Sequence, residues 1–341
     1  MARNLLDRNL LDEDRPDTVR LSEAEARAVA MRALDRCGYD DDNATIITNQ
    51  LIDNALCGYP FASLPRILTI AEEARNRQTR TEPAIVRETE SSALVDGGNT
   101  IGYIAAFRGA EIAASKAKAN GISIVGVYNS FYSGRNAWFV EHIVKHDLVA
   151  IHTCSASPRV LPPGSRAPLL GTNPIAIGFP STNGPVVWDI GTASVMWGDV
   201  QLMARLGHEL PEGTGFDQDG KPTRDAAAAL KGGVAPWGGH KGYGLSFCIQ
   251  ALGLIAGAAL GRGVVNDYGF LFIAIDPGLT QPDDAFQRQM TELVETIKAL
   301  PKQDGVEEIR IPSERSFHDR TRRRIEGIVV EKKIIDLLDA L

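Results

Sequence analysis

The sequence predicts a layered α/β fold joined to a small helical unit, and two observations support this prediction. After Arg80, short runs rich in β-branched residues alternate with segments of helical periodicity, the pattern of a sheet flanked by helices. Before Arg80, only helix signals occur. The chain has 341 residues, enough for two domains of about 150 residues each. We therefore expect residues 1–80 to form a helical domain joined by residues 316–341, and residues 81–315 to form the α/β domain.

The helical unit is predicted from helix start and stop signals. Ser22 begins a capping-box pattern, and Gly38 is a natural end for the helix that follows. A second helix is expected from about Asn43 to Cys57, with its apolar residues on one stripe and Gly58 as its end. Pro65 stands at a first-turn position of a third helix.

The α/β unit is predicted from alternating elements. The expected strands are Ala84–Val86, Ala93–Val95, Ile122–Val127, Val149–Thr153, Pro174–Phe179, Val186–Ile190 and Phe270–Ile275. The expected helices are Ile104–Asn120, Ala137–His146, Thr192–Leu206, a buried helix His240–Leu260, Asp283–Leu300 and a last helix Glu331–Leu341. A turn at Gly97–Asn99 is expected to separate the second strand from the first of these helices.

The charge balance argues against two classes of partner. Thirty-six Lys and Arg residues against 43 Asp and Glu residues give a net charge of −7. Nucleic acids and anionic membranes both favour a basic face, so we expect neither as the main partner. The acidic run Asp40–Asp42 and the basic run Arg320–Arg324 each lie beside charges of opposite sign, and both are interpreted as solvated surface.

Cysteine usage and the first residues indicate a cytoplasmic protein. The four cysteines, at positions 37, 57, 154 and 248, are scattered and fit reduced thiols rather than a disulfide framework. Residues 1–20 lack the apolar core of a signal peptide, and the longest apolar stretch is too short to span a bilayer. We expect a soluble, cytoplasmic protein with a sizeable core.

Several common site motifs are missing. The sequence contains neither G-x-G-x-x-G after a strand nor G-x-x-x-x-G-K-[ST], so an ordinary Rossmann fold or P-loop has no support. It also lacks H-E-x-x-H and G-x-S-x-G, and its His and Cys residues have no metal-ligand spacing. We therefore expect no metal site. His142 and His146 are four residues apart, but a third ligand is missing, and a solvated helix face is the simpler interpretation.

Four loops of small residues lie at the ends of predicted strands. They are Asn129–Gly134, Leu170–Pro174, Asp189–Ser194 and Gly238–Gly244. Each one alone fits ordinary turn chemistry. Together they indicate a ligand site, because such loops offer backbone N–H groups at helix N-termini, where phosphates bind, and Lys241 adds a positive charge.

At Gly164–Pro180, Asp189–Ser194 and Gly239–Leu245 the sequence resembles the type-2 malate/L-lactate dehydrogenase family. That family includes ureidoglycolate, sulfolactate and diketogulonate dehydrogenases and cyclic-imine reductases. The resemblance runs from the second helix to Ile311–Arg315. It implies a non-Rossmann NAD(P) fold, in which a mixed α/β domain accompanies a helical domain. It also implies a homodimer with the site near the subunit interface.

The resemblance also implies site residues. A substrate carboxylate would be held by Arg66, with Thr172 and Asn173 on the substrate side of the site. His240 and Lys241 would lie near the cofactor phosphates or ribose. The other implied cofactor residues are Ser130, the strand residues Val186, Val187, Trp188, Asp189, Ile190 and Gly191, and the closing turn Ser313, Glu314 and Arg315. The cofactor would be NAD or NADP.

One departure from the family pattern bears on the chemistry. The family pattern after the second helix is R-G-x-x-S-H-G-x-x-R, and its histidine is the proton donor. Aligned on Gly58 and Arg66, the histidine position holds Ala62 and the serine position holds Phe61. The second family histidine, in N-S-x-H, corresponds to Tyr132, and the first 141 residues contain no histidine at all.

This departure leaves three hypotheses open. Tyr132 or Tyr59 donates the proton, since a phenol of ordinary pKa about 10 is a usable acid for a developing alkoxide. Alternatively, the substrate is an iminium, which needs no strong acid there and which Asp189 could stabilise. The third hypothesis is a protein that binds a dinucleotide without catalysis.

Structural roles for the same residues also stay open. Tyr132 could pack beside Phe131, His240 could cap its helix, and Asp189 could be a helix N-cap rather than a cofactor ligand. His152, in a strand-like run, is interpreted as a core histidine. The function we expect is hydride transfer between a nicotinamide and a small 2-oxo or 2-hydroxy acid. A cyclic or N-substituted 2-imino acid is the alternative substrate.

Overall fold

The computed structural model describes residues 15–73, 78–259, 268–282 and 284–341. The chain divides into two compact units. Unit 1 is drawn from Met1–Thr79 and Ser313–Leu341, and unit 2 is Arg80–Pro312. In the described residues no helix is long and apolar enough to cross a bilayer.

Unit 1 is built mainly from helices. Its elements are β1 (Thr18–Leu21), α1 (Glu23–Arg36), α2 (Asp41–Leu56), α3 (Pro65–Glu72), α10 (Glu314–Glu326), β12 (Ile328–Glu331) and α11 (Lys332–Asp339). The three predicted helices of this part of the chain are confirmed. Ser22 and Glu25 form the capping box, since the backbone N–H of Ser22 donates to Glu25 Oε2 at 2.8 Å and the Ser22 hydroxyl accepts from the Glu25 N–H. Gly38 and Gly58 follow α1 and α2 with φ of +79° and +78°.

Helix α10 and the pairing of β1 with β12 were not predicted. The interpretation of Arg320–Arg324 as solvated surface holds for Arg324 but is wrong for Arg320 and Arg323. Arg323 is only 3% exposed, donates to the Leu56 carbonyl at 3.0 Å and pairs with Asp319. Arg320 forms an ion pair with Asp53 at 2.8 Å. The run makes more than one turn of α10, so that Arg320 and Arg323 reach carbonyl or carboxylate partners inside unit 1 while Arg324 is exposed.

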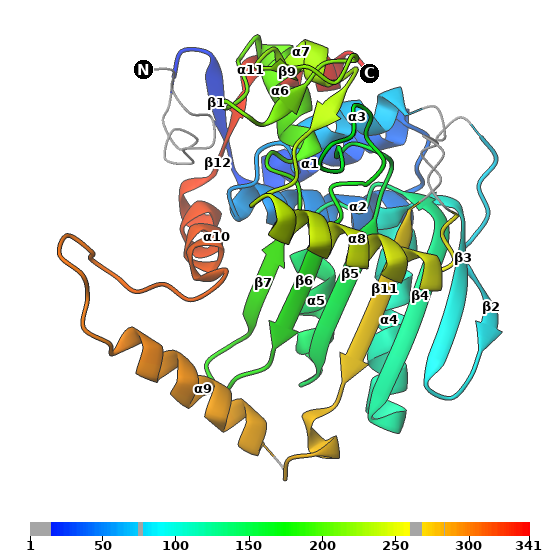
Figure 1. Cartoon of the computed structure of the whole chain (residues 1–341), viewed down its shortest axis with the longest axis vertical. Helices are drawn as coiled ribbons and strands as arrows, with labels where there is room; N and C mark the ends of the chain where they lie inside the picture. Colours follow the sequence, from blue (N-terminus) through cyan, green and yellow to red (C-terminus); the bar gives the residue numbers. More distant parts are fainter. Residues whose placement is uncertain (1–14, 74–77, 260–267, 283) are drawn as a thin grey trace. The chain divides into compact units, whose positions relative to one another are not determined.

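Unit 2 is built around a seven-stranded mixed sheet, which confirms the predicted α/β class (Figure 1). Its strand order is β2 (Ala84–Glu88), β3 (Ser92–Ile101), β4 (Ile122–Phe131), β11 (Gly269–Ile275), β5 (Val149–Ser155), β6 (Ile175–Phe179) and β7 (Val186–Ile190). Only β3 and β4 pair in parallel, and every other neighbouring pair is antiparallel. The remaining elements are α4 (Gly102–Asn120), α5 (Asn136–Val144), α6 (Trp197–Leu206), α7 (Ala226–Ala229), α8 (His240–Ile255), the 3₁₀ turn η3 (Pro277–Leu279), α9 (Ala285–Lys298) and a small sheet of β10 (Gly233–Val234), β8 (Gly215–Phe216) and β9 (Pro222–Thr223).

Helices cover both faces of the large sheet. Helices α4 and α5 lie on one face, and α8 crosses the other (Figure 1). Helix α5 packs very close to β6 at Gly178. A Cβ on Gly178 would lie 2.3 Å from Val140 Cγ1 and 2.7 Å from Val144 Cγ2. Glycine at this position therefore lets α5 approach the sheet.

An aromatic layer fills the space between the sheet and α5. His152 is fully buried, its ring stacks on Phe272 with centroids 4.0 Å apart, and Phe139 of α5 meets it edge-on. Its Nδ1 lies 3.0 Å from the Leu271 carbonyl. Burial lowers the pKa of His152 to about 3, so the ring is neutral and serves as core, as predicted.

Several predicted element boundaries differ from the structure, most clearly around β3, β4 and α6. The turn Gly97–Asn99 does not end β3 but forms an irregularity in it, and pairing with β4 resumes at Thr100. Strand β4 continues to Phe131. Helix α6 begins at Trp197 rather than Thr192, because the Thr192 N–H donates to the Thr172 carbonyl and is held in a loop.

The predicted buried helix is only half buried. In α8, Phe247, Leu254 and Ile255 are 61%, 45% and 66% exposed. Its sequence is apolar all round, which predicts burial, but one side of the helix packs on β5 and β11 and the other side faces outward.

Candidate active site

Four of the predicted site residues of unit 2 lie at one edge of the large sheet. Strands β4, β5 and β7 run in the same direction, because the antiparallel strands β11 and β6 alternate with them. Their carboxyl ends therefore share an edge with the beginnings of β6 and β11. This edge carries Tyr132 after β4, Thr172 and Asn173 before β6, and Asp189 in β7. We call these four residues the strand-end site.

Asp189 joins the end of β7 to the N-terminus of α5. Its Oδ2 accepts the backbone N–H of Ala137 at 2.8 Å, and the backbone N–H of Asn136 also stabilises the carboxylate. Sequence analysis left a cap or a cofactor ligand open for this residue. The structure shows a cap, but of α5 rather than of the helix that follows β7. A carboxylate at this position complements the positive end of the helix dipole.

The environment of Asp189 makes it titrate near neutrality. Part of the residue stays accessible, but its carboxyl group is enclosed. This enclosure raises the pKa of Asp189 to about 6, against the opposing effects of the Ala137 N–H and the Arg135 guanidinium. A carboxyl group with this pKa can hold or release a proton under physiological conditions.

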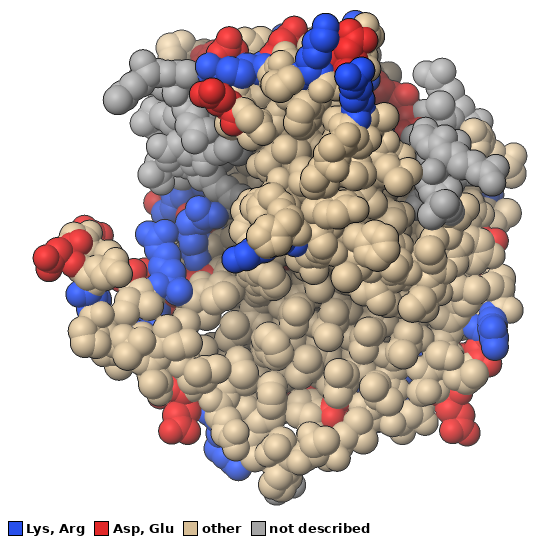
Figure 2. Space-filling model, in the orientation of Figure 1, with Lys and Arg blue, Asp and Glu red and all other residues tan. Residues whose placement is uncertain are grey.

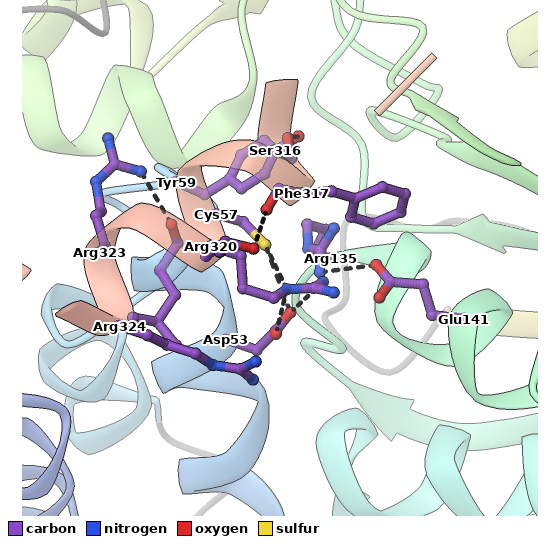
Figure 3. A network of polar contacts seen from close by, with 12 residues as sticks. Asp53, Cys57, Tyr59, Arg135, Glu141, Ser316, Phe317, Arg320, Arg323 and Arg324 are labelled. Atoms are coloured by element: carbon purple, nitrogen blue, oxygen red, sulfur yellow. Dashed lines mark hydrogen bonds and ion pairs between the residues drawn. The ribbon is translucent and has the colours of Figure 1, made fainter. Parts of the chain in front are cut away.

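Arg135 and Glu141 form a buried ion pair (Figure 3). Both charges act on Asp189. Arg135 Nη2 lies 3.2 Å from Glu141 Oε1, and the two side chains are 4% and 8% exposed. Arg135 favours the ionised form of Asp189, whereas Glu141 opposes it. Neither residue was predicted as part of the site. The one available signal was an arginine inside a loop of small residues, and its partner six positions later becomes visible only once α5 is formed.

Tyr132 lies directly after β4 with an unusual backbone conformation. Its φ is +39°, a region that a residue with a bulky side chain rarely adopts. Its ring meets Phe131 and Tyr268 edge-on, with centroids 5.7 and 6.2 Å away. The expected packing beside Phe131 is therefore present. Burial, and then the nearby Tyr132, raise the pKa of the Tyr268 phenol, which sequence analysis also missed.

Cys154 of β5 belongs to the same edge but is no nucleophile. Burial raises the pKa of its thiol to about 12, although a hydrogen bond with Ser133 acts against the rise. The thiol therefore stays protonated. Among the described parts of the chain, no group of three or more His, Cys, Asp or Glu residues is arranged for a metal ion.

Two predicted ligand residues use their side chains to hold the chain together. Ser130 is fully buried, and its hydroxyl donates to the Thr100 carbonyl at 2.6 Å. Asn173, also fully buried, accepts from the Ala156 N–H and donates to the Ser246 carbonyl at 2.9 Å and to Gln250 Oε1 at 3.1 Å. The Asn173 bonds join the loop before β6 to the end of β5 and to α8. The side chains of Ser130 and Asn173 therefore stabilise the fold around the site.

The loop after β7 connects the strand-end site to the N-terminus of α8. The backbone N–H of Trp237 donates to the Thr192 carbonyl at 2.7 Å, and the backbone N–H of Ser194 donates to the Ala235 carbonyl at 2.9 Å. Trp237 is followed by two glycines and then by His240 and Lys241, the first residues of α8. The structure therefore brings the predicted cofactor residues of β7 and α8 into one connected region.

The N-terminus of α8 has the chemistry that an anionic group requires. Its N-cap residue is Gly239, which has no side chain to cap the helix, and His240 and Lys241 are both exposed. A Cβ on Gly238 or Gly239 would meet nothing within 4 Å, so space is open around this end. Exposed first-turn N–H groups, a helix dipole and a lysine fit the phosphates of a dinucleotide. The expected capping role of His240 is not found.

Unit 1 holds the other predicted site residues. The Arg66 guanidinium lies over the Phe61 ring, 4.2 Å from its centroid. The Tyr59 hydroxyl lies 3.2 Å from Ser316 Oγ. Ser313, with φ of +62°, is the N-cap of α10, so Glu314 and Arg315 are helical residues of unit 1 rather than a turn of the α/β unit.

A polar network in unit 1 was also missed by sequence analysis (Figure 3). Arg320 of α10 reaches both carboxylate oxygens of Asp53, at 2.8 and 3.1 Å. Its Nε also lies 3.2 Å from Cys57 Sγ. The residues are more than 260 positions apart in the sequence, so no local pattern could pair them. The network fixes α10 to α2 within unit 1.

Asp189 leads to a prediction for stability against pH. Because its folded pKa of about 6 lies above the ordinary value of 3.8, its contribution to stability is full below pH 4 and is lost as pH rises through 6. The wild-type free energy of unfolding should therefore fall by about 2 kcal/mol relative to Asp189→Asn between pH 4 and 7. Urea unfolding at several pH values measures this difference.

The Asp189→Ala variant separates the stabilising effect of the hydrogen bond to α5 from the effect of the carboxyl group's titration. It lacks the acceptor for the Ala137 N–H, so it should be less stable than Asp189→Asn at every pH, by about 1 kcal/mol. Wild-type and Asp189→Asn profiles that run parallel from pH 4 to 7 would show that the carboxyl group is not perturbed.

Comparisons with known proteins identify the family. The family model described as malate/L-lactate dehydrogenase matches residues 21–339. The L-sulfolactate dehydrogenase of Methanothermobacter thermautotrophicus is 33% identical over 329 residues, covering 93% of this chain and 95% of that protein. The Delta(1)-pyrroline-2-carboxylate reductase of Ancylobacter novellus is 31% identical, covering 95% of this chain and 98% of its own.

A solved structure agrees with the fold. The dehydrogenase from Sinorhizobium meliloti superposes with a TM-score of 0.87 at 27% identity, covering 95% of this chain and 98% of that one. The match therefore includes both units rather than a shared sheet alone. The chain belongs to the malate/L-lactate dehydrogenase family and is a dehydrogenase of that family.

Proposed function

We propose that this protein transfers hydride between the nicotinamide of NAD or NADP and a small 2-oxo or 2-hydroxy acid of the malate or sulfolactate type. The observation that carries the proposal is the connected region formed by Asp189, the N-terminus of α5 and the N-terminus of α8. It offers a titrating carboxyl group and an uncapped helix end within one unit. Family membership and the sulfolactate relative support the substrate class.

The proposed cofactor site follows β7 to the start of α8. Val186–Gly191 would lie along the dinucleotide, and Lys241 with the first N–H groups of α8 would bind its phosphates. His240, exposed beside Lys241, would lie at the same end. When bound, the nicotinamide supplies or accepts the hydride. The loop Gly191–Met196, held by Thr172 and Trp237, would keep these two segments in place.

Arg66 is the proposed ligand of the substrate carboxylate. Its guanidinium lies over the Phe61 ring, a cation–π contact made by the face of the planar group rather than by its N–H donors. Arginine suits this role because its charge is permanent and its donors form a rigid fork. Thr172, half buried at the strand-end site, is proposed on the substrate side.

Tyr132 is the proposed proton donor of the keto-acid reaction. On the alignment used above, the histidine position is Ala62, so another acid is required. Tyr59 is less suited, because its hydroxyl shares a hydrogen bond with the buried Ser316. Tyr132 stands at the strand-end site, and its strained backbone conformation is a cost that function can explain.

An imino acid is the second candidate substrate, and two observations favour it. The pyrroline-2-carboxylate reductase relative covers nearly the whole chain. Asp189, with a pKa near 6, is ionised at neutral pH and would stabilise an iminium cation without an added acid. Hydride transfer to such a cation needs no proton for a developing alkoxide.

We further propose that the protein works as a homodimer through the exposed side of α8. From Gly242 to Ile255 this helix has no charged side chain, and the surface over it is largely uncharged (Figure 2). Phe247 and Ile255 are each more than 60% exposed, which is costly for a monomer. A second copy of the chain is the proposed occupant, in line with the dimer that the family resemblance implies.

A substrate panel with Tyr132→Phe tests the proposed reaction. Wild-type protein should oxidise NADH or NADPH with oxaloacetate, pyruvate or piperideine-2-carboxylate, measured by absorbance at the nicotinamide band. Tyr132→Phe should lower kcat for keto acids by about 10² or more, since a general acid contributes ~10²–10⁴. Imine reduction should change by less than about tenfold.

Tyr128→Phe is the matched control for this panel. Its hydroxyl lies on the same strand but is bonded to Asp96, at 3.2 Å, so its loss should leave kcat unchanged. A keto-acid kcat in Tyr132→Phe within tenfold of wild type would remove Tyr132 as the acid. Wild-type turnover with the imine alone would favour the second candidate, and no binding of NADH or NADPH would refute both.

The dimer proposal is tested by light scattering after size exclusion. Wild-type protein should have twice the chain mass, and Phe247→Asp with Ile255→Asp should shift it toward the 36.8 kDa monomer. Val86→Asp is the control, because it also replaces an exposed apolar side chain by a carboxylate, at a 54% exposed position on β2. This variant should remain dimeric. A wild-type monomer, or a double variant that stays dimeric, would contradict the proposed interface.

A further inference from the structure

Asn136 is a buried amide whose hydrogen bonds are unaccounted for. It is the first residue of α5 and only 2% exposed. Within the described chain neither its Oδ1 nor its Nδ2 has a hydrogen-bond partner. Its backbone N–H, in contrast, has a partner, because it stabilises the Asp189 carboxylate. A buried polar group without a partner is destabilising, and native proteins retain one mainly where a water or a ligand completes it.

The backbone of Asn136 lies next to Val186–Gly191, the segment proposed to lie along the dinucleotide. The neighbouring Ala137 N–H is bonded to Asp189 of β7 at 2.8 Å, so the start of α5 and the end of β7 are in direct contact. The preceding residue, Arg135, is committed to Glu141. Asn136 is therefore a side chain at this contact that retains both donors and an acceptor for a ligand.

The ligand chemistry follows from what the amide leaves open. A carboxylate would accept from Nδ2 and leave Oδ1 without a donor, whereas a primary carboxamide satisfies both atoms at once. Charge favours the same choice, because Asp189 and Glu141 both lie close by and disfavour another anion. The complementary group is thus neutral and planar, with one acceptor and one donor.

We propose that Asn136 binds the carboxamide of the nicotinamide, with Nδ2 donating to the carboxamide oxygen and Oδ1 accepting from its NH₂ group. This inference rests on the proposed function, because it requires that the protein bind a nicotinamide dinucleotide. It makes Asn136 a cofactor-positioning residue. Two hydrogen bonds to the carboxamide fix the rotation of the ring and so select which of its faces meets the substrate.

The inference is tested by calorimetric titration with two dinucleotides. The first is NADH or NADPH, whichever wild-type protein binds more tightly, and the second is its reduced 3-acetylpyridine analogue. The analogue keeps the acceptor oxygen but has a methyl group in place of NH₂. Wild-type protein should bind the analogue about five- to tenfold more weakly, tenfold corresponding to about 1.4 kcal/mol. Asn136→Ala should bind the natural cofactor about tenfold more weakly and discriminate less than about twofold.

Thermal melting gives a second readout that a purely structural role would not reproduce. Because the Asn136 amide has no bond within the described chain to lose, apo Asn136→Ala should melt at or above the wild-type temperature. The rise in melting temperature on adding cofactor should be smaller than in wild type. Asn120→Ala is the control, since its amide donates to the Glu90 and Lys116 carbonyls and should leave both titrations unchanged.

The outcomes separate this inference from the proposed function. If wild-type protein binds neither dinucleotide, the proposed function fails and the inference fails with it. If wild-type protein binds the cofactor but Asn136→Ala has the same affinity within twofold and the same discrimination, the inference alone is refuted. A lower apo melting temperature with unchanged discrimination would also refute it, since the amide would then serve the fold.

Discussion

The candidate site depends on one contact, between the Asp189 carboxylate and the backbone N–H groups that begin α5. This contact joins the edge strand of the sheet to a helix that Gly178 allows to lie close against it. Burial of the carboxyl group raises its pKa to about 6, and the N–H groups of the helix end act against this rise. The proton affinity of the site is therefore a balance between burial and the bonds that stabilise the helix end.

Charge at the site opposes the charge of the whole protein. The chain carries a net charge of −7, which by itself would repel a dinucleotide and a carboxylate substrate. Local positive groups of unit 2 act against this, namely the N-terminus of α8 and Lys241. Electrostatic attraction at short range depends on these few groups, because salt screens the net charge beyond about 10 Å.

Local signals predicted most of the elements correctly. The capping box at Ser22, the helix ends at Gly38 and Gly58 and the β-branched run from Ile122 all depend on residues close in sequence. Arg320 was misinterpreted for the opposite reason. Its partner Asp53 lies 267 residues away, so a basic run looked solvated until α10 was packed on α2.

The site was predicted in part, for the same physical reason. Asp189, Tyr132 and the loops at the strand ends were named from short motifs, and the sheet topology brings them to one edge. Ser130 and Asn173 were named as ligand residues, but in the structure their side chains hydrogen-bond to other strands and helices. The sequence could not show these bonds, because their partners are distant in the chain. Arg135, Glu141 and Asn136 were missed because their roles exist only once α5 meets β7.

The central claim is that the strand-end region, with the N-termini of α5 and α8, binds the dinucleotide. Hydrogen exchange followed by mass spectrometry, with and without saturating NADH or NADPH, tests it most directly. We expect slower exchange in Ser133–Ala137, Gly191–Met196 and Ala235–Gly242, and unchanged exchange in β2, at the far edge of the sheet. Protection confined to other segments, or none in these three, would contradict it.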